Sequence, residues 1–162
     1  MKRLVLASAF CLALLAPARA VSLLDVRVTT PAAAQISPTF HLRAPSGQTP
    51  AANLLLQGMF TYSSGGTSAD AWVQTSIDGG NTWTDVANFH FTKSSARFLY
   101  NLSSATPVSG EYTPTDGTLA PNTAKDGLIG PLWRVKYTIV GTYGDGTTLR
   151  VDAFAQGVTP FP

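Results

Sequence analysis

Short runs of alternating apolar and polar residues, separated by turn residues, make up most of the chain beyond residue 20. Alternation with a period of two is typical of half-buried strands, and no segment beyond residue 20 shows the spacing of an amphipathic helix. We therefore expect an all-β protein, a single antiparallel β-sandwich of jelly-roll-like form over residues 21–162. The runs predict about eight strands, over residues 23–29, 40–43, 54–62, 71–77, 82–91, 97–102, 132–143 and 147–155.

The residues between the runs predict how the strands are joined. Gly144-Asp145-Gly146 separates two alternating runs, which is a strong signal for a hairpin. Gly58, inside the run at 54–62, indicates a β-bulge. Residues 103–131 hold four prolines and little periodicity, so we expect a long ordered loop with one short strand near 111–113. Loops of this length often carry function or contact a partner, although some merely cross the end of a sandwich.

The first twenty residues have the composition of a secretory signal peptide. Met1-Lys2-Arg3 is positively charged, residues 4–16 are apolar, and Ala18-Arg19-Ala20 fits a cleavage site. The apolar run is short for a transmembrane helix, so we expect no membrane contact once residues 1–20 are removed. The alternative is an ordered apolar arm that docks on another subunit. Cys11 is the only cysteine, so the remainder has no disulfide and no cysteine-based metal site.

Charge changes the picture once this leader is set aside. The whole chain has a formal charge of +2, but Lys2, Arg3 and Arg19 belong to the leader. Eight basic residues then stand against nine acidic ones, a formal charge of −1. No basic stripe remains to follow a phosphate backbone, so we expect no nucleic-acid partner.

The stretch SIDGGNTW, residues 76–83, fits the Asp-box pattern S-x-D-x-G-x-T-W found in sialidases. Its residue types also suit a tight hairpin: Asp78 accepts backbone hydrogen bonds, Gly80 tolerates positive φ, and the Ser76 and Thr82 hydroxyls tie the flanking strands together. Trp83 is expected to fold back as a buried apolar plug. A single copy of the box in a chain this short cannot build a multi-blade propeller. We therefore interpret the five residues as a structural turn motif.

Other candidate chemistry is sparse. His41 and His90 are the only histidines, and each lies beside phenylalanine in a strand-like run, so we expect structural or surface roles for both. Glu111 is the only glutamate, and no phosphate loop or zinc motif is present. The sequence predicts no enzyme, no cofactor and no metal. Trp72 is a candidate for stacking on a sugar, whereas Trp133 shares the apolar face of its strand and is expected in the core.

Three longer phrases resemble a group of small β-rich proteins of tailed bacteriophages and prophages, mostly of unassigned function. They are ADAWVQTSIDGGNTWTDVANFHFT at 69–92, TPTDGTLAPNTAKDGLIGPLWRVKYTIVGTY at 113–143 and GDGTTLRVDA at 144–153. The resemblance covers residues 28–155 and transfers no active-site residues. It implies a virion structural protein, such as a capsid decoration, neck or tail component, with virion proteins or further copies of itself as partners. A signal peptide departs from that pattern, because virion proteins normally assemble in the cytoplasm.

Two functions follow as hypotheses. The first is a non-enzymatic virion protein that contacts its neighbours, through exposed strand edges and the 103–131 loop, as a homo-oligomer. The second is a secreted or periplasmic binding module, with carbohydrate as its ligand.

Overall fold

The structure, a computed structural model, describes residues 20–42 and 52–156. These residues form nine β-strands and no helix, which confirms the all-β prediction. The predicted leader at 1–20, apart from Ala20, and the end of the predicted strand at 40–43 lie outside the described residues. The strands are β1 (Val21–Arg27), β2 (Ala32–Ile36), β3 (Phe40–His41), β4 (Asn53–Thr61), β5 (Ser68–Ser76), β6 (Thr84–Phe91), β7 (Ala96–Ser103), β8 (Leu132–Val140) and β9 (Thr148–Gln156).

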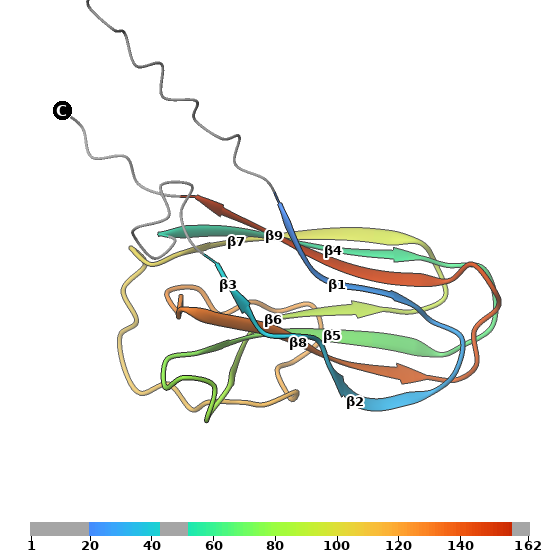
Figure 1. Ribbon diagram of the computed structural model, residues 1–162, viewed down its shortest axis with the longest axis horizontal. Helices are drawn as coiled ribbons and strands as arrows, with labels where there is room; N and C mark the ends of the chain where they lie inside the picture. Colours follow the sequence, from blue (N-terminus) through green and yellow to red (C-terminus); the bar gives the residue numbers. More distant parts are fainter. Residues whose placement is uncertain (1–19, 43–51, 157–162) are drawn as a thin grey trace, which may run out of the picture.

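The strands form two antiparallel sheets that pack face to face, as Figure 1 shows. Sheet A has the order β1-β9-β4-β7, and sheet B has the order β2-β8-β5-β6, with β3 also paired to β8. Apart from β2 to β3, which follow one another along β8, only β5 and β6 are consecutive strands of the same sheet. Every other connection crosses between the sheets, as in a jelly roll.

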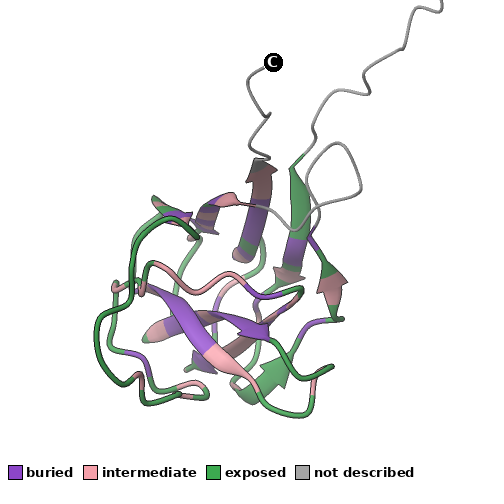
Figure 2. Cartoon of the chain, turned by 90° about the vertical axis from the view of Figure 1, so that its left-hand side faces the viewer, coloured by how far each residue is buried: buried purple, intermediate pink, exposed green. Residues whose placement is uncertain are grey.

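The core lies between the sheets and is built by the alternation read from the sequence. In β4 the even-numbered residues Leu54, Leu56 and Phe60 are buried, and in β8 the buried residues include Trp133 and Val135. The side chain of Trp133 is fully buried, which confirms its assignment to the core. Figure 2 shows that buried positions concentrate on the strands, whereas exposed positions dominate the loops.

The predicted hairpin at Gly144-Asp145-Gly146 is wrong. β8 pairs with β5, β2 and β3 in sheet B, whereas β9 pairs with β1 and β4 in sheet A. The turn therefore carries the chain from one sheet to the other. The buried faces of β8 and β9 both point into the core from opposite sides, so matching alternation in the two runs indicates shared burial and not pairing.

The predicted bulge at Gly58 is also wrong. β4 pairs with β7 and with β9 in continuous register through Gly58, without a shift. The reason for glycine lies across the sandwich. A Cβ atom at residue 58 would lie 2.5 Å from Cγ of Phe89, so the close approach of that ring leaves no space for a side chain.

The long loop between β7 and β8 is ordered, and it covers the outer edge of β6. Backbone bonds join Asp85 N to Thr115 O, Asn88 N to Thr123 O, and Lys125 N to Val86 O, each at 2.8 Å. Residues 111–113 form no strand, which corrects that part of the prediction. Because the loop satisfies the free edge of β6, sheet B cannot be extended by another strand there.

Candidate functional site

The five residues of the Asp-box pattern form one turn between β5 and β6. The Asp78 carboxylate accepts the backbone N–H of Thr82, at 2.9 and 3.0 Å, and the hydroxyls of Thr82 and Ser76, at 2.7 and 2.8 Å. Ser76 Oγ accepts the N–H of Gly80 at 2.9 Å, and Trp83 Nε1 donates to Gly80 O at 2.9 Å. The hydrogen bonds from Thr82 and Ser76 lower the pKa of Asp78 to about 2.

Two details of this turn differ from expectation. The Ser76 and Thr82 hydroxyls donate to Asp78 and do not bridge the flanking strands. Trp83 is only half-buried and is not a core plug. The Arg134 guanidinium lies over its ring, 4.2 Å from the centroid, so the indole contributes a cation–π contact beside sheet B.

Trp72, the candidate for ligand stacking, lies beneath the long loop. Its side chain is half-buried, and Nε1 donates to Leu119 O at 3.0 Å. This bond fixes the indole against the loop, so a sugar would reach only the part that the loop leaves uncovered. Stacking on Trp72 stays a prediction.

Asp85 of β6 is the residue that holds the long loop in place. The side chain is fully buried, and the carboxylate accepts the backbone N–H groups of Gly117, Thr118 and Leu119 at 2.9 to 3.1 Å. Gln74 Nε2 donates to the same carboxylate at 2.7 Å. A buried charge is tolerated when hydrogen bonds replace its hydration, so Asp85 acts as an internal clamp on the loop.

Charged side chains at the surface of sheet B contact the partners of Asp85. Arg134 Nε donates to Gln74 Oε1 at 2.7 Å, and Lys136 Nζ lies 3.0 Å from Asp116 Oδ1. Burial alone raises the pKa of Asp116, but hydrogen bonds from Gln74 and Lys136 and the nearby positive charges outweigh it, so the net shift is downward. These polar groups are engaged with one another, which makes the loop a fixed part of the sandwich.

The two histidines lie apart. His41 is exposed on β3, whereas His90 of β6 places Nδ1 2.8 Å from Asp70 Oδ1. Asn122 Oδ1 accepts the backbone N–H of His90 at 3.0 Å, which ties this strand to the long loop. Among the described residues, the His90 ring is hydrogen-bonded to Asp70 alone, so no nucleophile completes a catalytic triad with the pair there.

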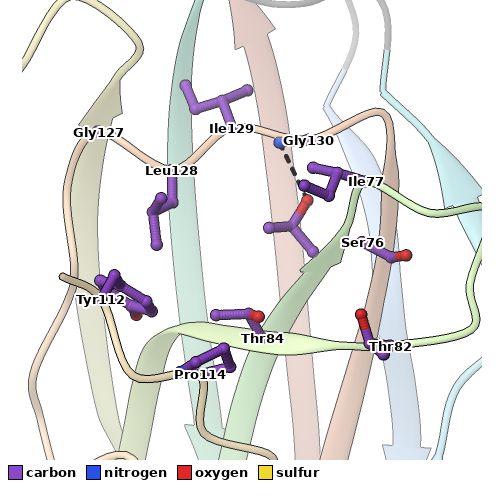
Figure 3. Close-up of a pocket in the computed structure, with 11 residues that line it drawn as sticks. Ser76, Ile77, Thr82, Thr84, Tyr112, Pro114, Gly127, Leu128, Ile129 and Gly130 are labelled. Carbon is purple, nitrogen blue, oxygen red and sulfur yellow. Dashed lines mark hydrogen bonds between the residues drawn. The ribbon is translucent and has the colours of Figure 1, made fainter. Parts of the chain in front are cut away.

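A cavity of about 350 Å³ opens where the Asp-box turn meets the long loop. Figure 3 shows Leu128 and Tyr112 on one side of it, with Ile77 on the other side next to Gly130. Ile77 is 83% exposed, which is high for a large aliphatic side chain. The volume lies in the range of small-ligand sites. We call this cavity the turn pocket.

The polar groups of the turn pocket are largely used within the chain. The lining contains no charged side chain, and three of its four serine and threonine hydroxyls donate to the protein itself: Thr75 to Leu132 O, and Ser76 and Thr82 to Asp78. Among the described residues, the Thr84 hydroxyl makes no hydrogen bond. Tyr112 donates its hydroxyl to Asp85 O at 2.9 Å, and burial raises its pKa. The pocket therefore favours an apolar occupant.

Comparison with known proteins gives no relative. No family model, no curated protein and no solved structure matches this chain. The resemblance to phage proteins therefore stays a prediction.

Two further features of the described residues bear on the site. No group of three or more His, Cys, Asp or Glu side chains there could hold a metal ion. Across residues 20–42 and 52–156, no helix is both long and apolar enough to cross a membrane.

Sequence reasoning found the Asp-box turn but missed the clamp and the pocket. Asp85 lies in the run TDVANFHF, where one acid looks like an ordinary surface residue. Its partners in the long loop lie 32 to 34 residues further along the chain, and a local sequence pattern does not reveal contacts between residues so far apart. The one sequence signal that could have indicated the clamp is the turn dipeptide Asp116-Gly117, whose backbone N–H groups are available to a carboxylate on a neighbouring strand.

Proposed function

We propose that this chain is a non-enzymatic structural protein of a tailed phage or prophage particle, and that it binds a neighbouring particle protein at the turn pocket. The observation that carries the proposal is the composition of that pocket. It is preformed by a clamped loop, it has no charged lining, and Ile77 projects at its rim. Covering an aliphatic side chain of this kind stabilises a contact by about 1.5–3 kcal/mol.

Protein is favoured over sugar as the occupant because of the hydrogen-bonding inventory. A carbohydrate presents many hydroxyls, and its site needs several free polar groups to match them. The turn pocket has largely committed its own, whereas Leu128, Ile129 and Pro114 offer apolar surface. An aliphatic or aromatic side chain from a partner protein fits this lining.

The jelly-roll order of the sheets is compatible with the proposal. Jelly rolls serve as viral capsid domains and also as lectin domains, so the fold is an analogy and not a proof of function. The resemblance to phage proteins supports the first of these. The signal-like leader at 1–20 supports the second candidate, a secreted or periplasmic module that binds carbohydrate.

Incorporation into particles tests the proposal. Particles from the source phage or prophage are purified and analysed by mass spectrometry, and tagged variants are expressed during assembly. We expect the wild-type chain and the Val140→Asp variant to be incorporated into the particles. The Ile77→Asp and Leu128→Asp variants should be absent from them. Val140 is a matched control because it is 49% exposed and does not line the pocket.

Three results would count against this function. The chain could be absent from purified particles, or Ile77→Asp could incorporate as well as Val140→Asp. A mature protein that begins at Val21 in the periplasm, together with glycan binding that is lost in Trp72→Ala, would instead support the carbohydrate module.

A further inference from the structure

Strand β7 lies at the edge of sheet A, and within residues 20–42 and 52–156 no strand pairs with its outer side. Its one strand partner is β4. Among the described residues, no loop or side chain donates to or accepts from the outward backbone groups of residues 97–102. The corresponding edge of sheet B is different, because the long loop bonds to β6 at Asp85, Val86 and Asn88. The described residues thus cover the β6 edge of sheet B and leave the outer edge of β7 unpaired.

β7 also lacks the usual features that prevent strand pairing. Edge strands are commonly protected by a bulge, a proline, several charges or short length. β7 has eight residues, contains no proline, and keeps an unbroken register with β4 from Ser103 to Ala96. Arg97 is its only charged residue, and Phe98 and Leu99 are 37% and 52% exposed.

An apolar patch on the outer face of sheet A continues from this edge. Leu55 of β4 pairs directly with Phe154 of β9, and Leu99 of β7 shares with both a shallow hollow of about 170 Å³. Leu55 is 37% exposed, and the polar residues Gln57, Arg97 and Asp152 also line the hollow. The edge and the patch therefore form one surface that combines unpaired backbone with apolar side chains.

We propose that two copies of this chain form a dimer by pairing β7 with β7 antiparallel about a two-fold axis. The pairing joins the two copies of sheet A into one continuous sheet, with four strands from each copy. With the two-fold axis perpendicular to the sheet, residues that lie opposite one another must have their side chains on the same face. Their residue numbers therefore differ by zero or by an even number. The patches of the two copies then lie side by side.

The sequence of β7 selects the register. With Leu99 opposite Leu99 of the second copy, Arg97 faces Asn101 and Phe98 faces Tyr100. No like charges meet, and aromatic pairs form on the core side. Shifting the axis to Phe98 would place Arg97 opposite Leu99, and shifting it to Tyr100 would place Leu99 opposite Asn101. The register centred on Leu99 matches apolar with apolar and polar with polar.

The dimer is tested by mass and by single-cysteine cross-linking. Light scattering after size exclusion is expected to give twice the monomer mass for the full chain. In Leu99→Lys two like charges meet at the axis, so we expect half that mass with an unchanged far-UV spectrum. Val140→Lys, a change of equal chemistry on sheet B, is expected to stay dimeric.

Cross-linking keeps the test valid if Leu99→Lys fails to fold. In a Cys11→Ser background, Leu99→Cys places two Cβ atoms about 5 Å apart, close enough for a disulfide after small adjustment. Arg97→Cys alone places its two copies four residues apart along the strands, about 13 Å, and should not cross-link. A monomeric wild-type chain, a mass of three or more copies, or cross-linking of Arg97→Cys but not Leu99→Cys would overturn the proposal.

Discussion

Replacing Asp85 by alanine removes the clamp and should detach the long loop from sheet B. The variant deprives the N–H groups of Gly117, Thr118 and Leu119, and the amide of Gln74, of a shared acceptor. Thr118 is exposed, so water can replace its lost bond, but Leu119 and Gln74 are buried. A buried donor left without an acceptor costs about 1–3 kcal/mol, so two such groups give a loss of about 2–4 kcal/mol, because Gln74 keeps its bond to Asp116.

Two measurements check this expectation. Urea unfolding gives the free energy of unfolding, and a loss of about 2–4 kcal/mol is large against a total of about 5–15 kcal/mol for a domain. Hydrogen exchange followed by mass spectrometry reports the loop directly. Amides of residues 117–119 should exchange faster in Asp85→Ala, while those of β4 and β9 keep their protection.

Asp126→Ala is the matched control. Asp126 also accepts loop hydrogen bonds, from the N–H of Ser103 and Gly127 and from the Thr106 hydroxyl, but it is exposed. Water can replace these bonds, so the expected loss is below about 1 kcal/mol. The reasoning is refuted if the two variants are equally stable, or if amides 117–119 remain protected in Asp85→Ala.

Three further changes probe other contacts. Gly58→Ala should lower the free energy of unfolding by about 1–3 kcal/mol through overpacking against Phe89, and adding Phe89→Leu should recover part of it in a double-mutant cycle. The pKa of Asp78 lies at about 2 when folded, against an ordinary value of 3.8, so its contribution to stability is present above pH 3.8 and disappears as the pH falls toward 2. When thermal unfolding of Asp78→Asn is measured across that pH range, its stability should lack the loss that comes from protonating Asp78. Trp72→Phe removes the bond to Leu119 O and should cost about 1 kcal/mol in urea unfolding; an unchanged midpoint would contradict it.

The elements of this fold were largely readable from the sequence, whereas their pairing was not. Alternation showed which side of strands such as β8 and β9 is buried, and the Asp-box predicted the hairpin between β5 and β6. The hairpin at residues 144–146 failed because glycine and aspartate favour a turn without specifying which sheet the chain enters next. Strand β2 was missed because AAAQI has little apolar alternation and is mostly exposed. In this fold, pairing is a property of the two-layer packing and not of local pattern.

The candidate site was less predictable for a related reason. The turn motif is local, so its residue types were enough to predict that Ser76, Asp78 and Thr82 belong to one hydrogen-bonded turn. The turn pocket arises where that turn meets residues 112–114 and 127–130, which lie about 30 to 50 positions further along the chain. Proline and glycine indicated an irregular loop there, but the place of the loop is determined by its bonds to distant residues, those to Asp85 and to the edge of β6 among them.

The two proposed contacts lie on different sheets: the turn pocket is beside sheet B, and the dimer edge is β7 of sheet A. The two proposals can therefore be tested independently. The long loop covers the β6 edge of sheet B, so a partner on that side docks through side chains in the turn pocket. In the part of the chain that the structure describes, nothing pairs with the outer edge of β7, so sheet A can be extended by a strand there. A dimer would carry two turn pockets, and two sites acting together raise the apparent affinity for a repetitive particle surface. We therefore expect Leu99→Lys to weaken retention on particles without abolishing it, while Ile77→Asp abolishes it even as the dimer persists. Equal loss in both variants would show that the pocket and the β7 edge form a single interface.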